Sequence, residues 1–217
     1  MNLSRQYTEK DLKYFQGKRL EMVDYVPQQA KVILDVGCGA GNFGKSLKQL
    51  RSAEVWGVEI DERAAQEASN KLDKVVNAPF DGNLSLPNHT FDCVSFIDVL
   101  EHFIDPEDAL EYTKKLLAPQ GVVVACIPNI RYFDFLWDLL VNKKWEYTDK
   151  GILDRTHLRF FTYSSILSMF NRLNYKVELI QGIHPTGVRK FYWLNRLTLG
   201  HLEDAMYLHF VIVASVN

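Results

Sequence analysis

The chain has 217 residues, and with 47% hydrophobic and 12% aromatic residues it carries enough apolar material for one continuous core. Its 25 basic and 27 acidic residues nearly cancel, so no excess positive field exists to hold a phosphate backbone or an anionic bilayer. This balance disfavours extended nucleic-acid binding, and no apolar run reaches the ~18 residues of a membrane span or forms a signal peptide.

Short β-branched segments alternate with amphipathic segments over the first two thirds of the chain. This pattern is typical of a parallel sheet covered by helices, and it predicts a doubly wound α/β fold. The predicted strands are residues 31–36, 54–59, 74–77, 91–97, 121–127, 176–181 and 208–215. The predicted helices are residues 9–25, 42–51, 62–72, 106–117 and 164–173. Asp61 and Asp105 are expected to cap two of these helices.

The first predicted strand ends in alternating glycines, Gly37, Gly39 and Gly41, immediately before a helix. Glycine permits positive φ and close backbone approach, and a helix N-terminus offers amides to a ligand. Together with Gly44 the turn also matches a dinucleotide fingerprint, which alone is weak evidence. Asp35 at the strand end would repel a pyrophosphate but suits a ligand that carries an ammonium and a sulfonium. We therefore expect S-adenosylmethionine as the cofactor in preference to NAD.

Glu59 ends the second predicted strand. Its spacing from the glycine turn is that of a carboxylate which accepts hydrogen bonds from both hydroxyls of a ribose. Because either nucleotide carries this ribose, Glu59 supports a nucleotide site without choosing the cofactor.

Two segments, residues 131–163 and 182–206, fall outside the alternation and follow the carboxyl ends of late strands, where open α/β sheets bind ligands. The first is dense in aromatic residues, and we expect some of them to roof an acceptor site. An alternative is that residues 133–141 lie on a membrane that carries a lipid-linked substrate. In the second segment, Arg189, Lys190 and Arg196 are expected to form a solvated face, or alternatively to meet a phosphate on the acceptor.

The three cysteines, Cys38, Cys93 and Cys126, cannot all pair, and each lies in or beside an apolar segment. Buried, unpaired cysteines fit a reducing compartment. We therefore expect a cytoplasmic protein in which residues 1–217 form a single domain with two acceptor-side insertions.

Four segments, ILDVGCGAGNFG, VWGVEID, FDCVSFIDVLEHFIDPEDAL and LLAPQGVVVACIPN, occur in the order of the motifs of class I S-adenosylmethionine-dependent methyltransferases. The chain resembles this family over residues 31–129. The resemblance implies a seven-stranded, mostly parallel sheet with an antiparallel last strand and helices on both faces. It implies the following cofactor-binding residues: Asp35, Gly37, Cys38, Gly39, Gly41, Glu59, Ile60, Phe80, Asp98, Val99 and Leu100.

The stretch after the third strand departs from that family. An acid usually lies near the adenine amine there, whereas this chain has residues 77–80, NAPF, so Asp81 or the backbone is expected to substitute. The resemblance also suggests that Tyr7, Tyr14 and Arg19 cover the cofactor carboxylate, with simple packing against the sheet as the alternative.

The acceptor side contains two candidate catalytic histidines, His102 and His157. A hydroxyl acceptor must lose its proton during in-line methyl transfer, and histidine suits that role at neutral pH. The segment WEYTDKGILDRTHLRFFT, with IPNI, resembles bacterial sugar and polysaccharide methyltransferases and ubiquinone-pathway O-methyltransferases. This similarity implies a hydroxyl of a small molecule or glycan precursor as the acceptor. We take His157 as the general base; the alternative is that Asp154, Arg155, His157 and Arg159 only lock the insertion.

Three further hypotheses remain beside this one. Asp98, Glu101, His102 and His157 could hold a divalent metal, as a similar arrangement does in methyltransferases that modify the terminal ribose of small RNAs. A second is an adenosylmethionine-binding regulator without turnover, against which the retained histidines and aromatic residues argue. The third, an NAD(P)-dependent oxidoreductase, is opposed by Asp35 and by the lack of a Tyr-x-x-x-Lys dyad.

Overall fold

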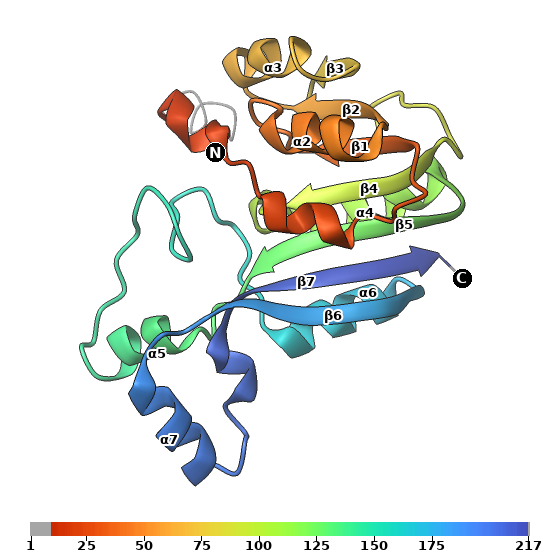
Figure 1. Ribbon diagram of the computed structural model, residues 1–217. Helices are drawn as coiled ribbons and strands as arrows, with labels where there is room; N and C mark the ends of the chain where they lie inside the picture. Colours follow the sequence, from red (N-terminus) through yellow and green to blue (C-terminus); the bar gives the residue numbers. More distant parts are fainter. Residues whose placement is uncertain (1–9, 217) are drawn as a thin grey trace.

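The computed structural model describes residues 10–216 and contains a seven-stranded sheet of order β3-β2-β1-β4-β5-β7-β6. Its strands are β1 Val32–Val36, β2 Glu54–Glu59, β3 Lys74–Asn77, β4 Phe91–Ile97, β5 Leu117–Pro128, β6 Tyr175–Pro185 and β7 Tyr207–Val216. Strand β7 runs antiparallel to β5 and β6, and the pairs among β1 to β5 are parallel (Figure 1). The predicted doubly wound sheet with an antiparallel last strand is confirmed.

Helices cover both faces of this sheet. The α-helices are α2 Asn42–Arg51, α3 Glu62–Ser69, α4 Pro106–Leu116, α5 Phe133–Leu140, α6 Tyr163–Arg172 and α7 Arg189–Leu197. The short 3-10 helices are η1 Leu12–Gln16, η2 Leu20–Tyr25, η3 Leu100–His102 and η4 Glu203–Met206. Helices α2, α3 and η2 share a core with one face, and α4 and α6 share a core with the other. Asp61 and Asp105 accept hydrogen bonds from the first-turn amides of α3 and α4, which confirms both predicted caps.

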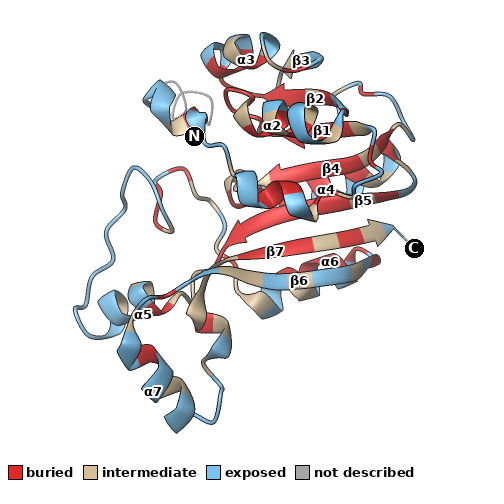
Figure 2. Cartoon of the chain, in the orientation of Figure 1, coloured by how far each residue is buried: buried red, intermediate tan, exposed pale blue. Residues whose placement is uncertain are grey.

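The core has two layers because neighbouring residues of each central strand point to opposite faces. Ile33 of β1 and Val124 of β5 belong to the apolar cluster on one face of the sheet. Their neighbours Leu34 and Val123 belong to the cluster on the other face. All four are fully buried, as Figure 2 shows for the central strands. A parallel sheet covered on both faces needs such continuous apolar strands, and it anchors the loops at its carboxyl edge.

The predicted helix at residues 9–25 is wrong over its described part. The chain forms η1 and η2 instead, separated by extended Gly17 and by Arg19, whose φ is 42°. The break lets the Phe15 carbonyl of η1 accept a hydrogen bond from the Ala40 amide in the glycine turn, and it lets Arg19 reach Asp98 after β4. Tertiary contacts therefore override the helical pattern here.

The two insertions fold largely outside the sheet. Strand β6 continues to Pro185, so the second insertion begins later than predicted. Helix α5, helix α7 and η4 pack around Phe133, Phe191 and Ala205, a small core separate from the sheet. We call residues 133–141 and 188–206 the α5–α7 unit; it extends beyond the carboxyl ends of β5 and β6, and most of its helical surface is exposed (Figures 1 and 2).

Candidate functional site

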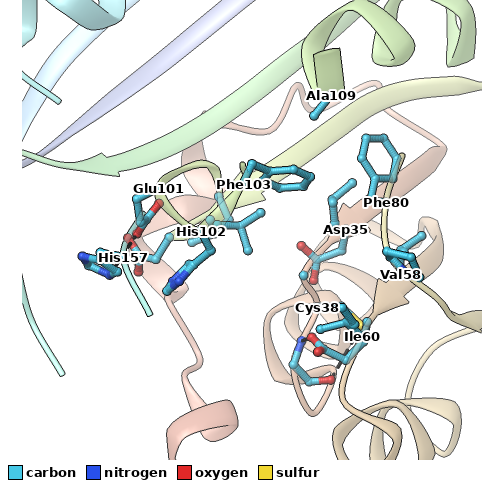
Figure 3. A pocket seen from close by; sticks show the side chains of 18 of the residues that line it. Asp35, Cys38, Val58, Ile60, Phe80, Glu101, His102, Phe103, Ala109 and His157 are labelled. Atoms are coloured by element: carbon cyan, nitrogen blue, oxygen red, sulfur yellow. Dashed lines mark hydrogen bonds and ion pairs between the residues drawn. The ribbon is translucent and has the colours of Figure 1, made fainter. Parts of the chain in front are cut away.

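A cavity of about 800 Å³ lies at the carboxyl edge of β1, β2 and β4. This volume is within the range of small-molecule sites, roughly 300–1,000 Å³. The glycine turn and the end of β2 line one side, and η3 with residues 151–157 of the first insertion lines the other. Figure 3 shows Asp35, Cys38 and Ile60 on the first side, facing Glu101 and His157 on the second.

The glycine turn is held close to its neighbours by backbone contacts. The amides of Gly37 and Cys38 both donate to the Val58 carbonyl, at 2.8 and 3.1 Å. Gly37 has a φ of 66°, and a Cβ placed on it would lie 2.1 Å from Cγ2 of Val99. Both the turn conformation and the packing therefore require glycine at this position. Gly37, Cys38 and Val99 line the cavity, as expected of cofactor-binding residues.

Gly39 and Gly41 complete the turn but lie in different environments. Gly39 lines the cavity, with a φ of 52°, beneath the Phe15 carbonyl. Gly41 has a φ of 74°, precedes α2 and packs against Ala68 and Leu72. It does not line the cavity, and its positive φ shapes the entry of the turn into α2.

The carboxylate of Glu59 is buried and oriented by two backbone amides. Its Oε2 accepts from Gly39 at 2.8 Å, and its Oε1 accepts from Asp61 at 2.9 Å. Burial raises the pKa of Glu59, and these amide contacts counteract the rise. Each carboxylate oxygen has a further lone pair, so the group can accept the hydrogen bonds of a diol in the cavity.

Asp35 is buried at the base of the cavity. Its Oδ1 accepts a hydrogen bond from the Ser95 hydroxyl at 2.9 Å. Burial raises the pKa of Asp35 to about 7, the Ser95 hydrogen bond lowers it, and the charge of Glu59 adds to the rise. A cationic ligand would favour the ionised carboxylate, so this site is suited to bind positive charge.

Phe80 and Ile60 form the wall where an adenine is expected. Phe80 is buried and meets Phe96 and Phe103 edge to face, with ring centroids 5.7 and 6.4 Å apart. Asp81, which was expected to replace the missing acid, also lines the cavity.

Asp98 directly follows β4, has a φ of 54° and pairs with Arg19 at 2.8 Å. Arg19 and Tyr14 both line the cavity, whereas Tyr7 lies outside the described residues. Leu100 is fully buried in the main core and does not line the cavity, because the 3-10 turn of η3 directs it inward.

The structure brings His102 and His157 together from separate segments, with ring centroids 4.7 Å apart. Nδ1 of His102 lies 3.0 Å from the Thr156 carbonyl, and Nδ1 of His157 lies 2.8 Å from the Ile152 carbonyl. A carbonyl only accepts, so each Nδ1 carries the proton and each Nε2 the lone pair. Burial lowers the pKa of both imidazoles, that of His102 to about 4 with a contribution from His157.

Glu101 lies beside this histidine pair and is 1% exposed. Among the residues that the structure describes, neither of its carboxylate oxygens has a hydrogen-bond partner; Nε2 of His157 is 3.8 Å from Oε1. Burial raises the pKa of Glu101 well above its ordinary value. Burying an ionised carboxylate without a partner costs free energy, so Glu101 either keeps its proton or faces a cation.

Glu101, His102 and His157 offer three ligand atoms that all lie within 4.8 Å of one another. One carboxylate and two imidazoles are ligands that Mn²⁺ or Zn²⁺ accepts. Asp98, the fourth residue of the predicted metal set, is not part of this group because Arg19 holds both its oxygens.

The remaining polar residues of the first insertion hold the loop in place. Asp154 is buried and accepts hydrogen bonds from Lys10 at 2.7 Å and from the amide and hydroxyl of Thr156. Arg155 and Arg159 are exposed and do not line the cavity. Arg159 donates to the Ile104 carbonyl, and Arg155 forms an exposed ion pair with Asp149 at 3.4 Å. These contacts fit the alternative of a locking role for the two arginines and Asp154, while His157 faces the cavity.

The structure does not place the predicted aromatic roof over this cavity. No phenylalanine, tyrosine or tryptophan of residues 131–163 lines it, and Gly151, Ile152, Asp154 and His157 border it there. The aromatic residues contact one another instead, as in the pairs Phe135–Trp145 and Trp145–Phe160, with ring centroids 5.5 and 6.0 Å apart.

The cavity is strongly acidic. Its acidic lining residues are Asp35, Glu59, Asp81, Asp98, Glu101, Asp105, Asp108 and Asp154. Within the described part of the chain, Arg19 is the single lysine or arginine among the lining residues, and Asp98 already neutralises it. Such a site favours neutral or positively charged ligands over anions.

Several lining residues were not predicted as site residues. They include Phe103, Asp105, Asp108 and Ala109 in the stretch that follows η3. Of these four, Asp105 was predicted only as a helix cap, and the others were given no individual role. His209 comes from the antiparallel strand β7 and approaches Asp98 to 3.6 Å. No local motif marks His209, because only the strand order brings it to the cavity.

Residues 7–180 match the family described as methyltransferase domain. The chain is similar to ubiquinone biosynthesis O-methyltransferases of Photobacterium profundum and Psychrobacter cryohalolentis, at 26% and 30% identity. Each alignment covers 76% of this chain, and they cover 72% and 66% of the relatives, so the chain matches about two thirds of their length.

Solved methyltransferase structures share the fold. An S-adenosylmethionine-dependent methyltransferase of Archaeoglobus fulgidus aligns over 98% of this chain and 97% of its own, with a TM-score of 0.65 and 20% identity. One from Aquifex aeolicus aligns over the whole of both chains, with a TM-score of 0.63 and 14% identity.

Proposed function

Because the chain belongs to the S-adenosylmethionine-dependent methyltransferase family, we propose that it methylates a hydroxyl of a neutral small molecule, such as a sugar or glycan precursor. The cofactor and enzyme class expected from the sequence are confirmed. The main support for the proposed reaction is the group of Glu101, His102 and His157, which faces the glycine turn across the cavity (Figure 3).

The glycine turn, Asp35 and Glu59 hold the cofactor in this proposal. When bound, S-adenosylmethionine supplies a methyl group on a positively charged sulfur. Asp35 balances the positive charge of the methionine end, Glu59 accepts from the ribose, and Phe80 with Ile60 borders the adenine. The buried walls exclude water, so that the acceptor is the nucleophile available to the methyl group.

His157 removes the proton of the acceptor hydroxyl through its Nε2. The Ile152 carbonyl holds the proton on Nδ1, which keeps the Nε2 lone pair on the reacting side of the ring. His102 is the weaker base because burial lowers its pKa to about 4. We therefore propose that His102 positions the acceptor and His157.

The charge of the cavity supports a neutral acceptor. A phosphorylated acceptor or an RNA end would place anions among the acidic lining residues, where Arg19 already pairs with Asp98. The RNA-end hypothesis is therefore the less favoured alternative. The names of the similar O-methyltransferases support oxygen as the methylated atom.

A divalent metal on Glu101, His102 and His157 is the second candidate, and the unpartnered carboxylate of Glu101 favours it. A metal there would bind the acceptor hydroxyl and lower its pKa. Glu101→Gln separates the two mechanisms. Without a metal, Glu101 keeps its proton and an amide replaces it with little loss of turnover; with a metal, the amide removes a charged ligand and turnover collapses.

The test is methyl transfer from radiolabelled S-adenosylmethionine to cell extract fractionated into glycans, small metabolites, RNA and protein. We expect label in the small-molecule or glycan fraction, and a loss of about 10²- to 10⁴-fold in turnover for His157→Ala. Cofactor affinity measured by calorimetry should be unchanged in that variant. His89→Asn, at an exposed histidine outside the cavity, serves as the control. Unchanged turnover in His157→Ala contradicts the assignment, and label confined to RNA or protein contradicts the acceptor class.

Chelation by EDTA completes the experiment. Activity that resists EDTA supports the imidazole mechanism, and activity that EDTA removes and Mn²⁺ or Mg²⁺ restores supports the metal site.

We further propose that residues 1–217 act as one methyltransferase domain. We place the protein in the cytoplasm, since Cys38, Cys93 and Cys126 are free and buried. None of the helices in the described part of the chain is long and apolar enough to cross a membrane.

A further inference from the structure

The outer face of α7 and the turn after it expose large apolar side chains. Trp193, Leu197 and Leu199 are 72%, 79% and 87% exposed, values that are unusual for such residues in water. Phe191, on the same helix, is fully buried in the small core of the α5–α7 unit. Helix α7 is therefore anchored by its inner face, and its outer apolar face remains exposed among residues 10–216.

Helix α7 itself carries only positive charges, whereas the exposed carboxylates of the unit, Asp134, Asp138 and Glu203, lie on α5 and η4. Arg189, Lys190 and Arg196 are all exposed on α7, and no carboxylate occurs between Glu178 and Glu203. The charge of the whole chain is nearly balanced because many of the acids lie in the cavity. The overall composition therefore does not reveal the positive charge of this segment. A helix with tryptophan, leucines and adjoining cations has the composition of segments that lie in an anionic membrane interface.

The position of the face relates it to the cavity. The α5–α7 unit extends from the carboxyl edge of the sheet, the edge at which the cavity lies (Figure 1). Leu208 and His209, which follow η4 of this unit along β7, line the cavity. On α5, Trp137, Leu140 and Val141 are exposed too, and Lys190 lies 5.9 Å from the Trp137 ring. The exposed apolar side chains of α5 and α7 thus belong to one protruding unit.

We propose that the outer face of α7 and residues 198–201 dock on an anionic phospholipid bilayer, with Trp193, Leu197 and Leu199 in the interface. Helix α7, Arg189–Leu197, lies along the bilayer and does not cross it. A symmetric contact with a second copy is less compatible with the charges, because it would bring the three cations near their own copies. Nucleic acid would leave the leucines without an apolar partner.

The test is co-sedimentation of the full chain with vesicles of phosphatidylcholine alone and of phosphatidylcholine mixed with phosphatidylglycerol. We expect binding to the mixed vesicles, weakened by salt, and much less binding to phosphatidylcholine. Trp193→Ser combined with Leu197→Ser should reduce the partition coefficient at least about tenfold. Replacing Arg189, Lys190 and Arg196 by glutamine should reduce it by about tenfold or more.

Leu50→Ser, at an exposed leucine of α2, is the matched control and should bind as the wild type does. Because all replaced side chains are exposed, cofactor affinity and the thermal unfolding midpoint should be unchanged in every variant. Absence of vesicle binding by the wild type overturns the proposal, as does equal binding by the variants and the wild type. If the Trp193→Ser, Leu197→Ser variant changes the oligomeric state, the face binds a second copy of the chain. If the protein binds single-stranded RNA in a salt-sensitive manner and does not bind vesicles, the face binds nucleic acid. Either result overturns docking on lipid.

Discussion

The cofactor side and the acceptor side of the cavity share one edge of the sheet but are built in different ways. The turn amides of Gly37 and Cys38 donate to the Val58 carbonyl of β2, and the buried Glu59 carboxylate accepts from the amides of Gly39 and Asp61. On the acceptor side, His102 and His157 are held by carbonyls of a loop, and the α5–α7 unit has a small core of its own. Under the proposed function, we therefore expect cofactor binding to depend on the central core and acceptor selection to depend on segments that can change without disturbing it.

The strongest test of this contrast is Gly37→Ala. The new Cβ would clash with Val99 while φ stays positive, so the turn must move. Strain and overpacking of about 2–4 kcal/mol predict a loss of cofactor affinity of about 100-fold, measured by calorimetry. Gly187→Ala, where a Cβ meets nothing within 4 Å, is the control and should bind normally. Normal affinity in Gly37→Ala would show that the turn is not part of the cofactor site.

Glu59→Gln tests the second anchor on the cofactor side. An amide nitrogen must now face either the Gly39 or the Asp61 amide, so one buried donor loses its acceptor. The loss of about 1–3 kcal/mol predicts a cofactor affinity about ten- to a hundredfold weaker, with a lowered thermal unfolding midpoint. Retained affinity would place the ribose away from Glu59.

The pH dependence of cofactor binding tests Asp35. Its pKa of about 7 in the folded protein means that binding of a cation must displace a proton at lower pH. Affinity should fall by up to about tenfold per pH unit below 7 and level off above it, with proton release detectable by calorimetry in buffers of different ionisation enthalpy. Asp35→Asn should remove this dependence, and a flat wild-type profile would contradict it.

The same group has the opposite effect on the ligand-free protein. The folded state binds a proton more tightly than the unfolded state between the ordinary pKa of 3.8 and about 7. The contribution of Asp35 to the free energy of unfolding is therefore present below this window and declines as pH rises through it. Denaturant titrations of wild type and Asp35→Asn at pH 4 and pH 7 check the sign.

The smallest effect on cofactor binding is expected from Phe191→Ala. This change empties the centre of the α5–α7 unit, where loss of a buried phenylalanine costs about 3–5 kcal/mol. Limited proteolysis should open the unit at residues 133–141 and 188–206, while cofactor affinity stays within about twofold because the sites share no partners. A large loss of cofactor affinity would show that the two sides are not independent.

The sequence was most informative where function depends on local spacing. The glycine turn, the caps Asp61 and Asp105 and the end of β2 are defined by residues close in the chain, so periodicity and turn chemistry were sufficient to locate them. The family motifs supplied the strand order, including the antiparallel β7, which no spacing in this single chain reveals.

The sequence was least informative where distant segments meet. Residues 9–25 have the pattern of a helix, yet contacts to Ala40 and Asp98 break it into η1 and η2. The aromatic residues of the first insertion pack on one another, and a count of aromatic side chains cannot distinguish this from a roof over the cavity. Histidines could be named as candidates from the sequence. That the buried carboxylate of Glu101 lacks a hydrogen-bond partner among residues 10–216 is visible only once the loop and η3 are folded together.

The most direct test of the account is a crystal structure of the protein with S-adenosylhomocysteine, the demethylated cofactor. We predict ribose hydroxyls within hydrogen-bond distance of the Glu59 carboxylate, the amino group on the Asp35 side of the glycine turn, and the sulfur directed toward Glu101 and His157. A ribose bound away from Glu59, or a sulfur directed away from the histidine pair, would contradict the proposed division of the cavity.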